Sequence, residues 1–288
     1  MKVSIFIAAV LVFGLQPLAA HAQGSLTPSG PPGATMLTLS QVEPRTPVDA
    51  VHTPGNSTTQ FLITSPGSYY LTTNVVGTNS EQGIEISANN VTLDLNGFSV
   101  VGPANAYNGI LISSGFSNSV VRNGIISGWN TFDAGIFSQA NNVVFDNLTV
   151  SSTCHGIESF GIGGVVRNCS ACNNYNYGIY IVGTNYWITG NNCVGNNTVN
   201  EPNGAAIYIS SANSRIEGNY VSGSGPAGYG IFINNIAGNT NNVAIRNAVQ
   251  GNSANDYFFN TSQIVGPLIT NTVSGIITNS NPWANFAF

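Results

Sequence analysis

A short motif, a small residue followed by Ile, recurs seven times in the chain and constrains its fold more than any other feature. The copies begin at Gly83, Gly109, Gly135, Gly156, Gly178, Ala206 and Gly230, at intervals of 26, 26, 21, 22, 28 and 24 residues. In each copy the Ile and the residue two places later should point to one face, and the residue between them to the other. This period of two is typical of a β-strand with one buried face. Units this short cannot bury an apolar face alone, so the motif predicts that successive copies stack.

A second strand follows each motif at a nearly fixed distance. Eleven residues after the first residue of five copies stand Asp94, Asp146, Arg167, Thr189 and Glu217, and we place Arg122 and Arg246 as their equivalents after longer turns. An apolar residue precedes each of these positions, and Asn or Gly usually follows, as a left-handed turn requires. Stacking would bring opposite charges of this column together, so we interpret the column as stabilising.

These patterns predict an all-β chain: a single-domain parallel β-helix of about seven to eight coils with N- and C-terminal caps. The 40 Asn and 33 Gly residues suit its many turns, and we expect some of the Asn side chains to form amide ladders. Charged residues make up only 6% of the chain, which argues against a helical bundle and against the basic face of a nucleic-acid-binding protein.

The chain divides into four expected segments. Residues 1–22 have the features of a signal peptide, with Lys2, an apolar run and a cleavage site at Ala22. Residues 23–60 form a Pro/Gly-rich leader and N-terminal wrap, residues 61–262 the β-helix and residues 263–288 the C-terminal cap. Cleavage would leave five Arg against 11 acidic residues, a net charge of −6. No later apolar run is long enough to span a membrane, so we expect a secreted protein, extracellular or periplasmic.

The coils resemble the right-handed parallel β-helix repeats of the pectin-lyase-like superfamily over about residues 60 to 260. The flanking sequences EPRTP, PGSYYL and NPWANF are similar to those of an exported bacterial β-helix family of undefined activity. The resemblance implies a right-handed coil and a sheet on which related enzymes bind glycans. It does not imply one chemistry, because many activities use this scaffold.

The outward position of the repeated motif is the candidate binding site. It is occupied by Glu85, Leu111, Phe137, Glu158, Tyr180, Tyr208 and Phe232. Sugar rings stack well on aromatic faces, so Phe137, Glu158, Tyr180, Tyr208 and Phe232 are the candidate substrate-binding residues. The alternative is that these rings stack on one another and shield the strand ladder.

Candidate catalytic groups precede the motif. His155 and Tyr177 should stack one coil apart, and Asp133 could orient His155. The alternative is that these residues pack at a strand entrance. Hydrolysis by two carboxylates is disfavoured, because Glu85 and Glu158 lie three coils, or roughly 14 Å, apart. Elimination from a uronic acid would need a cation beside the substrate, and Lys is absent from the mature chain.

We therefore expect a secreted β-helix protein that binds an extracellular polysaccharide or cell-surface glycan, and lyase-like cleavage of that glycan is left open. The alternative is a non-catalytic structural, surface or adhesin-type β-helix. We expect no nucleic-acid partner, no metal site and no cofactor, with calcium left open, and a monomer or homotrimer. The four cysteines Cys154, Cys169, Cys172 and Cys193 allow three disulfide pairings or four free thiols.

Overall fold

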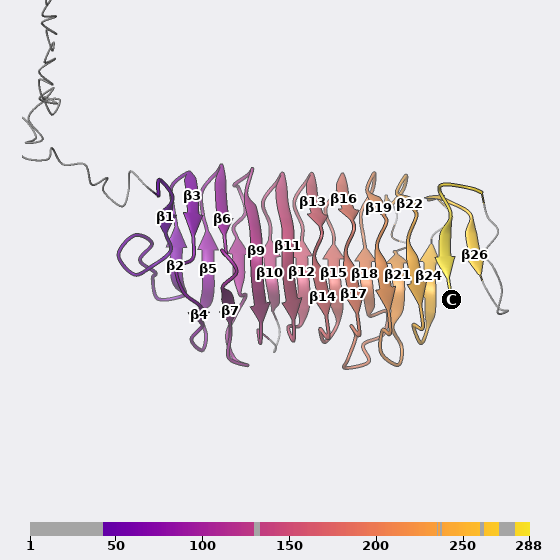
Figure 1. The fold of residues 1–288 in the computed structure, drawn as a ribbon, viewed down its shortest axis with the longest axis horizontal. Helices are drawn as coiled ribbons and strands as arrows, with labels where there is room; N and C mark the ends of the chain where they lie inside the picture. The colour runs from indigo at the N-terminus through magenta and orange to yellow at the C-terminus, as the bar shows by residue number, and fades with distance from the viewer. Residues whose placement is uncertain (1–42, 130–132, 235, 237, 260–261, 271–279) are drawn as a thin grey trace, which may run out of the picture. The chain divides into compact units, whose positions relative to one another are not determined.

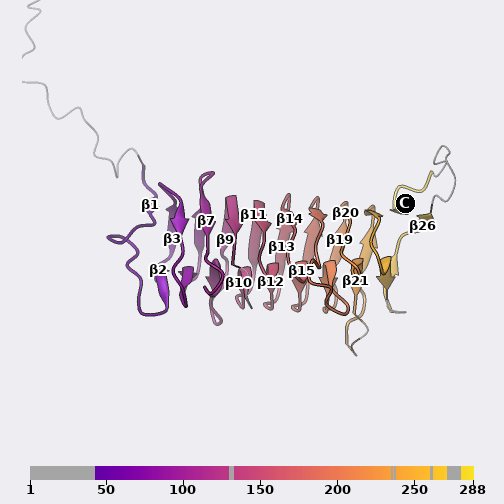
Figure 2. The same ribbon diagram turned by 90° about the horizontal axis from the view of Figure 1, so that it is seen from below.

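The strands of this chain stack into coils, so that equivalent strands of successive coils lie side by side (Figures 1 and 2). The computed structural model describes residues 43–288 except 130–132, 235, 237, 260–261 and 271–279. From Arg45 onward it is a right-handed parallel β-helix of about nine turns. All pairs between its named strands are parallel, and the described residues include no helix that could cross a membrane. The expected signal peptide and most of the leader lie outside the described residues.

One sheet contains the repeated motif and has nine strands. Its strands, in spatial order, are β2 (Thr59–Ile63), β5 (Gln82–Ile86), β8 (Ile110–Ile112), β10 (Ala134–Ser138), β12 (His155–Ser159), β15 (Tyr177–Ile181), β18 (Ala205–Ile209), β21 (Tyr229–Ile233) and β24 (Asn255–Phe259). We call its outward side the nine-stranded face.

The second sheet has 18 strands, arranged in two ladders that share the long strands β9 and β11. The first ladder is β1 (Thr46–Pro47), β3 (Gly67–Tyr70), β6 (Val91–Asp94), β9 (Val120–Ser127), β11 (Val143–Ser151), β13 (Gly164–Arg167), β16 (Tyr186–Thr189), β19 (Arg215–Glu217), β22 (Val243–Ile245) and β25 (Ile264–Val265). The second ladder adds β4 (Val75–Val76), β7 (Ser99–Val101), β14 (Ser170–Cys172), β17 (Asn192–Val194), β20 (Tyr220–Ser222), β23 (Ala248–Gln250), β27 (Asn285–Ala287) and β26 (Leu268–Thr270).

The first two residues of each motif lie where the repeat predicts. The motif Ile residues pair in register from coil to coil and are fully buried inside the stack. The glycines before them lie against the next coil: a Cβ at Gly156 would be 2.4 Å from the carbonyl oxygen of Gly178. A small residue is required there because successive coils approach so closely.

The coil count exceeds the predicted seven to eight, because the first and last strands of the nine-stranded sheet lack the motif. Phe61 in β2 pairs with Ile84, and Tyr257 in β24 pairs with Ile231. Aromatic residues thus occupy the motif Ile position at both ends of the sheet. A search for a small residue followed by Ile does not find these two strands.

The charged column on the larger sheet forms ion pairs, as expected. Arg122 binds Asp94 at 3.1 Å and Arg167 binds Asp146 at 2.8 Å. The predicted alignment is wrong at the last member, since Ile245 pairs with Glu217 and Arg246 occupies the turn with φ 58°. The Arg246 side chain nevertheless reaches Glu217 at 3.0 Å.

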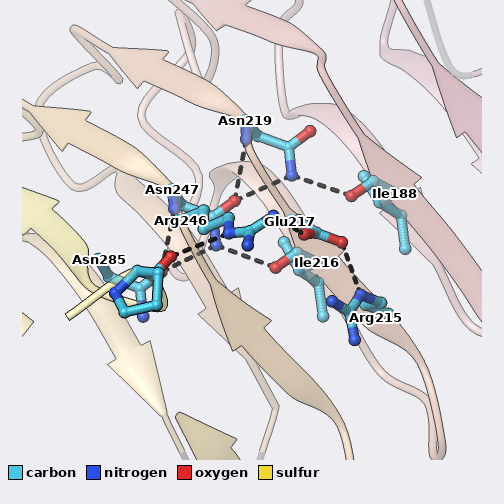
Figure 3. A network of polar contacts seen from close by, with 9 residues as sticks. Ile188, Arg215, Ile216, Glu217, Asn219, Arg246, Asn247 and Asn285 are labelled. Atoms are coloured by element: carbon cyan, nitrogen blue, oxygen red, sulfur yellow. Dashed lines mark hydrogen bonds and ion pairs between the residues drawn. The ribbon is translucent and has the colours of Figure 1, made fainter. Parts of the chain in front are cut away.

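Buried asparagines connect the coils at the turn between the two ladders of the larger sheet. In the series Asn191, Asn219, Asn247 and Asn285, each of the first three side-chain amides donates to the next Asn side chain at 3.0 Å. Figure 3 shows the last three members beside the Glu217 ion pairs. Each amide also donates to a backbone carbonyl of the preceding coil, as Asn219 does to Ile188 at 3.0 Å. The expected amide ladder is therefore present and buried.

Candidate functional site

The outward position of the motif forms one continuous column on the nine-stranded face. Each of its members pairs in register with the next, so every neighbour is one coil away. The column runs Leu62, Glu85, Leu111, Phe137, Glu158, Tyr180, Tyr208, Phe232 and Phe258. The structure thus brings together all five predicted substrate-binding residues and extends the column by one aromatic residue.

Aromatic rings contact one another without a break along this face. We define the aromatic strip as Phe137, Phe160, Tyr177, Tyr180, Tyr208, Tyr229, Phe232 and Phe258. The ring centroids of Phe137 and Phe160 are 5.3 Å apart, and those of Phe160 and Tyr180 are 6.1 Å apart. Further along, Tyr208 stacks on Phe232 at 5.0 Å and Phe232 stacks on Phe258 at 4.5 Å. These spacings are typical of attractive ring pairs, so the strip is packed as one unit.

The rings of the strip differ in solvent exposure. Tyr208 and Phe232 are only 9% and 7% exposed and pack with Tyr177, Tyr180 and Tyr229. These two predicted binding residues are thus largely covered by neighbouring rings, which is the packing that the stacking alternative describes.

The most exposed rings of the strip lie toward its two ends. Phe160 and Phe258 are 41% and 37% exposed, and Phe137 and Tyr180 are partly exposed. Sequence reasoning missed Phe160 because its equivalents in neighbouring coils, such as Gln139 and Val182, are not aromatic. No repeated pattern marks its position.

Next to the strip lies a buried ion pair that the sequence did not predict. His155 Nδ1 is 2.7 Å from Glu158 Oε2, and both side chains are largely buried. On its other side, His155 Nε2 lies 3.4 Å from Asn176 Nδ2, and its ring lies 5.1 Å from that of Tyr177. The expected stacking of His155 and Tyr177 is present, but the carboxylate that orients His155 is that of Glu158.

The ion pair sets the charge of the imidazole. Burial alone would favour the neutral ring, but hydrogen bonds to Cys154 and Glu158 outweigh it and raise the pKa of His155 to about 9. Burial and the nearby Glu158 charge raise the pKa of Asp133, and only the charge of His155 acts in the opposite direction. At neutral pH the cluster therefore holds an imidazolium between acidic groups.

This charge state makes the cluster unsuited to elimination chemistry. A lyase needs a group that accepts a proton near neutral pH. His155 is already protonated there, and burial, reinforced by the charges of neighbouring groups, raises the pKa of Tyr177 well above its usual value, so the phenol keeps its proton. The carboxylate of Glu158 is engaged by His155. His155 and Tyr177 are therefore not free bases at neutral pH.

Glu85 has a separate environment on the same face. Its carboxylate accepts hydrogen bonds from the hydroxyls of Ser113 at 2.7 Å and of Thr59 and Ser87 at 2.8 Å. Burial opposes ionisation, but these three donors lower the pKa of Glu85. Two column positions separate Glu85 from Glu158, so the two carboxylates do not form a catalytic pair.

Two further expectations from the sequence concern a metal site and the state of the cysteines. Within the described ranges, no group of three or more His, Cys, Asp or Glu residues is arranged to hold a metal ion. All four cysteines are free thiols, of which Cys169 and Cys193 are buried and Cys154 and Cys172 are partly exposed.

Comparison with known proteins finds similarity only among solved structures. No protein-family model and no curated protein matches the chain. The Dettilon tailspike protein gp208 aligns with 13% identity and a TM-score of 0.41 over 80% of this chain and 60% of its own. The enzymatically active domain of bacteriophage CBA120 tailspike protein 2 aligns with 16% identity and a TM-score of 0.48 over 72% of this chain and 42% of its own. The chain thus spans less than two thirds of either protein, and at these identities no residue's role can be transferred to it.

Proposed function

We propose that the protein is exported and that its aromatic strip binds an extracellular polysaccharide of uncharged sugars. The observation that carries this proposal is the unbroken row of rings on the nine-stranded face, of which Phe160 and Phe258 are exposed. From Phe137 to Phe258 the row crosses five strand spacings, or about 24 Å. Such a length suits an extended chain of sugars, whose apolar C–H faces stack on aromatic rings.

The charges of the chain support an uncharged ligand. All five Arg residues are in ion pairs with Asp or Glu, so none is left to bind a carboxylate or sulfate without breaking a pair. The cation nearest the strip, His155, is paired with Glu158. The expected net charge of −6 after signal-peptide removal would repel a polyanion.

Binding without cleavage agrees best with the ionisable groups of the site. His155 and Tyr177 both carry protons at neutral pH, which leaves the predicted His/Tyr pair without a base. The second candidate, a structural rod whose rings serve only to stabilise it, is favoured by the burial of Tyr208 and Phe232. The two functions differ in what the exposed rings do.

A retention experiment on immobilised polysaccharides tests the proposal. The purified chain is applied to a panel of uncharged and anionic polysaccharides, and soluble products are assayed for unsaturated ends to detect elimination. We expect retention on at least one uncharged polysaccharide, without cleavage. Phe160→Ala should weaken that retention roughly tenfold, since removal of one stacked ring costs about 1–1.5 kcal/mol.

The matched control is Trp187→Ala, which removes a 45% exposed ring from β16 of the larger sheet. This variant should bind like the original chain. Failure to bind any polysaccharide, or equal loss in both variants, would leave the structural rod as the function. Sedimentation of the same samples would decide between a monomer and the homotrimer that we also considered.

A further inference from the structure

The larger sheet carries a continuous row of apolar side chains on its outer side. Val120, Val144, Val165 and Trp187 pair in register in the first ladder, so each lies one coil from the next. The three valines are partly exposed and Trp187 is exposed, whereas the residue that follows each of them is buried. We call these four residues the apolar ridge. A contiguous row of this kind on a protein surface is typical of an interaction site.

The charged column runs directly beside the ridge on the same outer side. Asp94, Arg122, Asp146 and Arg167 occupy four successive coils, and each of the last three stands two residues after a valine of the ridge. Their signs therefore read minus, plus, minus, plus along the helix axis. This order reverses into its own complement, because the column read backwards is plus, minus, plus, minus.

This pattern fits a second copy of the same face in the antiparallel direction. With the two-fold axis between the coils of Arg122 and Asp146, Arg122 faces Asp146 of the second copy. Asp94 likewise faces Arg167 of the second copy. A shift of one coil in either direction, or a parallel alignment of the column on itself, would oppose like charges. The column thus selects one alignment of two copies.

The same alignment also matches the side chains of the ridge. At its centre Val120 faces Val144 of the second copy, so aliphatic groups meet where the two sheets pack. Thr92 and Ser68 continue the row in the preceding coils. They face Val165 and Trp187 of the second copy, which places the large indole opposite the small serine. Trp187 lies at the rim of this contact, where side chains contribute little to affinity.

We propose that the apolar ridge is the interface of an antiparallel homodimer. Burial of the valines supplies the affinity, and the charged column sets the direction and register of the two chains. The aromatic strip belongs to the other sheet and stays open in both copies. Dimerisation and binding of a polysaccharide by the strip are therefore separate properties, and either can fail without the other.

Sedimentation equilibrium of the chain without any polysaccharide tests the proposal. The apparent mass should rise toward twice the monomer mass as protein concentration increases. Val144→Lys places a charge at the centre of the contact, close to its symmetry mate, and should weaken the dimer at least about tenfold. The matched control is Val194→Lys, at a partly exposed valine of β17 in the second ladder, which should dimerise like the original chain.

A charge exchange tests the antiparallel alignment. Asp146→Arg combined with Arg167→Asp keeps the net charge and keeps opposite charges at these two neighbouring positions. The column then reads minus, plus, plus, minus, so antiparallel copies oppose like charges at all four coils, and dimerisation should fall. Circular dichroism shows whether each variant is folded, and the mass of the unchanged chain decides if one is not.

Three results would contradict the proposal. A monomer at every concentration, or a trimer, in the unchanged chain would overturn the dimer. Equal dimerisation of Val144→Lys and Val194→Lys would overturn the ridge as its interface. An undiminished dimer after the charge exchange would overturn the antiparallel alignment.

Discussion

At the scale of single residues, the chemistry of the nine-stranded face depends on where its few charges lie. His155 and Glu158 are three positions apart in one strand, and simple alternation would place their side chains on opposite faces. The structure nevertheless brings their polar atoms to 2.7 Å. The two residues between them, Gly156 and Ile157, are both buried, and β15 has the same burial pattern. The equivalent positions also meet in other coils, as in Tyr177 and Tyr180, whose ring centroids are 4.7 Å apart. The ion pair therefore uses a contact that recurs along the nine-stranded face.

This pair predicts how stability depends on pH. The folded-state pKa of His155 is raised from 6.5 to about 9, so its stabilising contribution is complete below about pH 6.5 and is lost as pH rises through about 9. The full effect is on the order of 3 kcal/mol. Urea unfolding at both ends of this interval should show a decrease in the free energy of unfolding.

The control for this measurement is Glu158→Gln, which keeps the size of the side chain and removes its charge. The variant should be less stable than the original chain at the low-pH end and should lose less stability as pH rises. If both proteins lose the same amount across the interval, groups other than the His155–Glu158 pair cause the decrease.

At the scale of elements, the asparagine series acts as a polar seam between coils. Asn219 uses its whole side chain: Nδ2 donates to Asn247 and to the carbonyl of Ile188, and Oδ1 accepts from the N–H and the Nδ2 of Asn191. Three of these four hydrogen bonds join Asn219 to neighbouring members of the series, and the fourth joins it to the carbonyl of Ile188. Removal of one amide therefore leaves groups unpaired on both adjacent coils.

We expect Asn219→Ala to lower the free energy of unfolding by about 2–4 kcal/mol, because several buried donors and acceptors lose their partner at once. The control is Asn213→Gly, in an exposed turn with φ 55°, where glycine adopts the same backbone without strain. It should change stability by less than about 1 kcal/mol. Urea unfolding of the three proteins checks both values, and equal losses would contradict a special role for the buried seam.

The strand ladders were predictable from sequence because stacking makes equivalent positions into neighbours. The motif Ile residues, the outward column and the Asp146–Arg167 ion pair all follow from that one rule. What the rule missed depends on single turns and on contacts between different positions of the coil. Arg246 is displaced by one residue in its turn, and Phe160 reaches the strip from a position that is polar or aliphatic in other coils.

The sequence predicted which residues line the candidate site, but not their burial or their side-chain contacts. The outward column identified which residues line the nine-stranded face, and stacking brought His155 next to Tyr177. Burial could not be inferred in the same way, because Tyr208 and Phe232 are covered by rings from adjacent positions. The strand register also does not specify side-chain directions. For that reason the sequence did not show that Glu158, rather than Asp133, contacts His155.

At the scale of the whole molecule, the arginine ion pairs and the proposed binding strip lie on different sheets. The arginines are all engaged in ion pairs with Asp or Glu, and three of the pairs join neighbouring coils on the larger sheet. The strip lies on the other sheet and consists of uncharged rings. Electrostatic attraction therefore has little part in binding by this face.

This separation predicts a distinctive dependence on salt. Retention on an uncharged polysaccharide should change less than about twofold between low and molar salt, because ring stacking involves no charge that salt could screen. Any weak binding of an anionic polysaccharide should increase with salt, because screening reduces its repulsion by a chain with more acidic than basic groups. Retention measured across a salt series on both kinds of polymer distinguishes these trends. A several-fold loss of binding at high salt would mean that a basic group contacts the ligand, which would require that the ion pair of His155 or of an arginine opens when the polysaccharide binds.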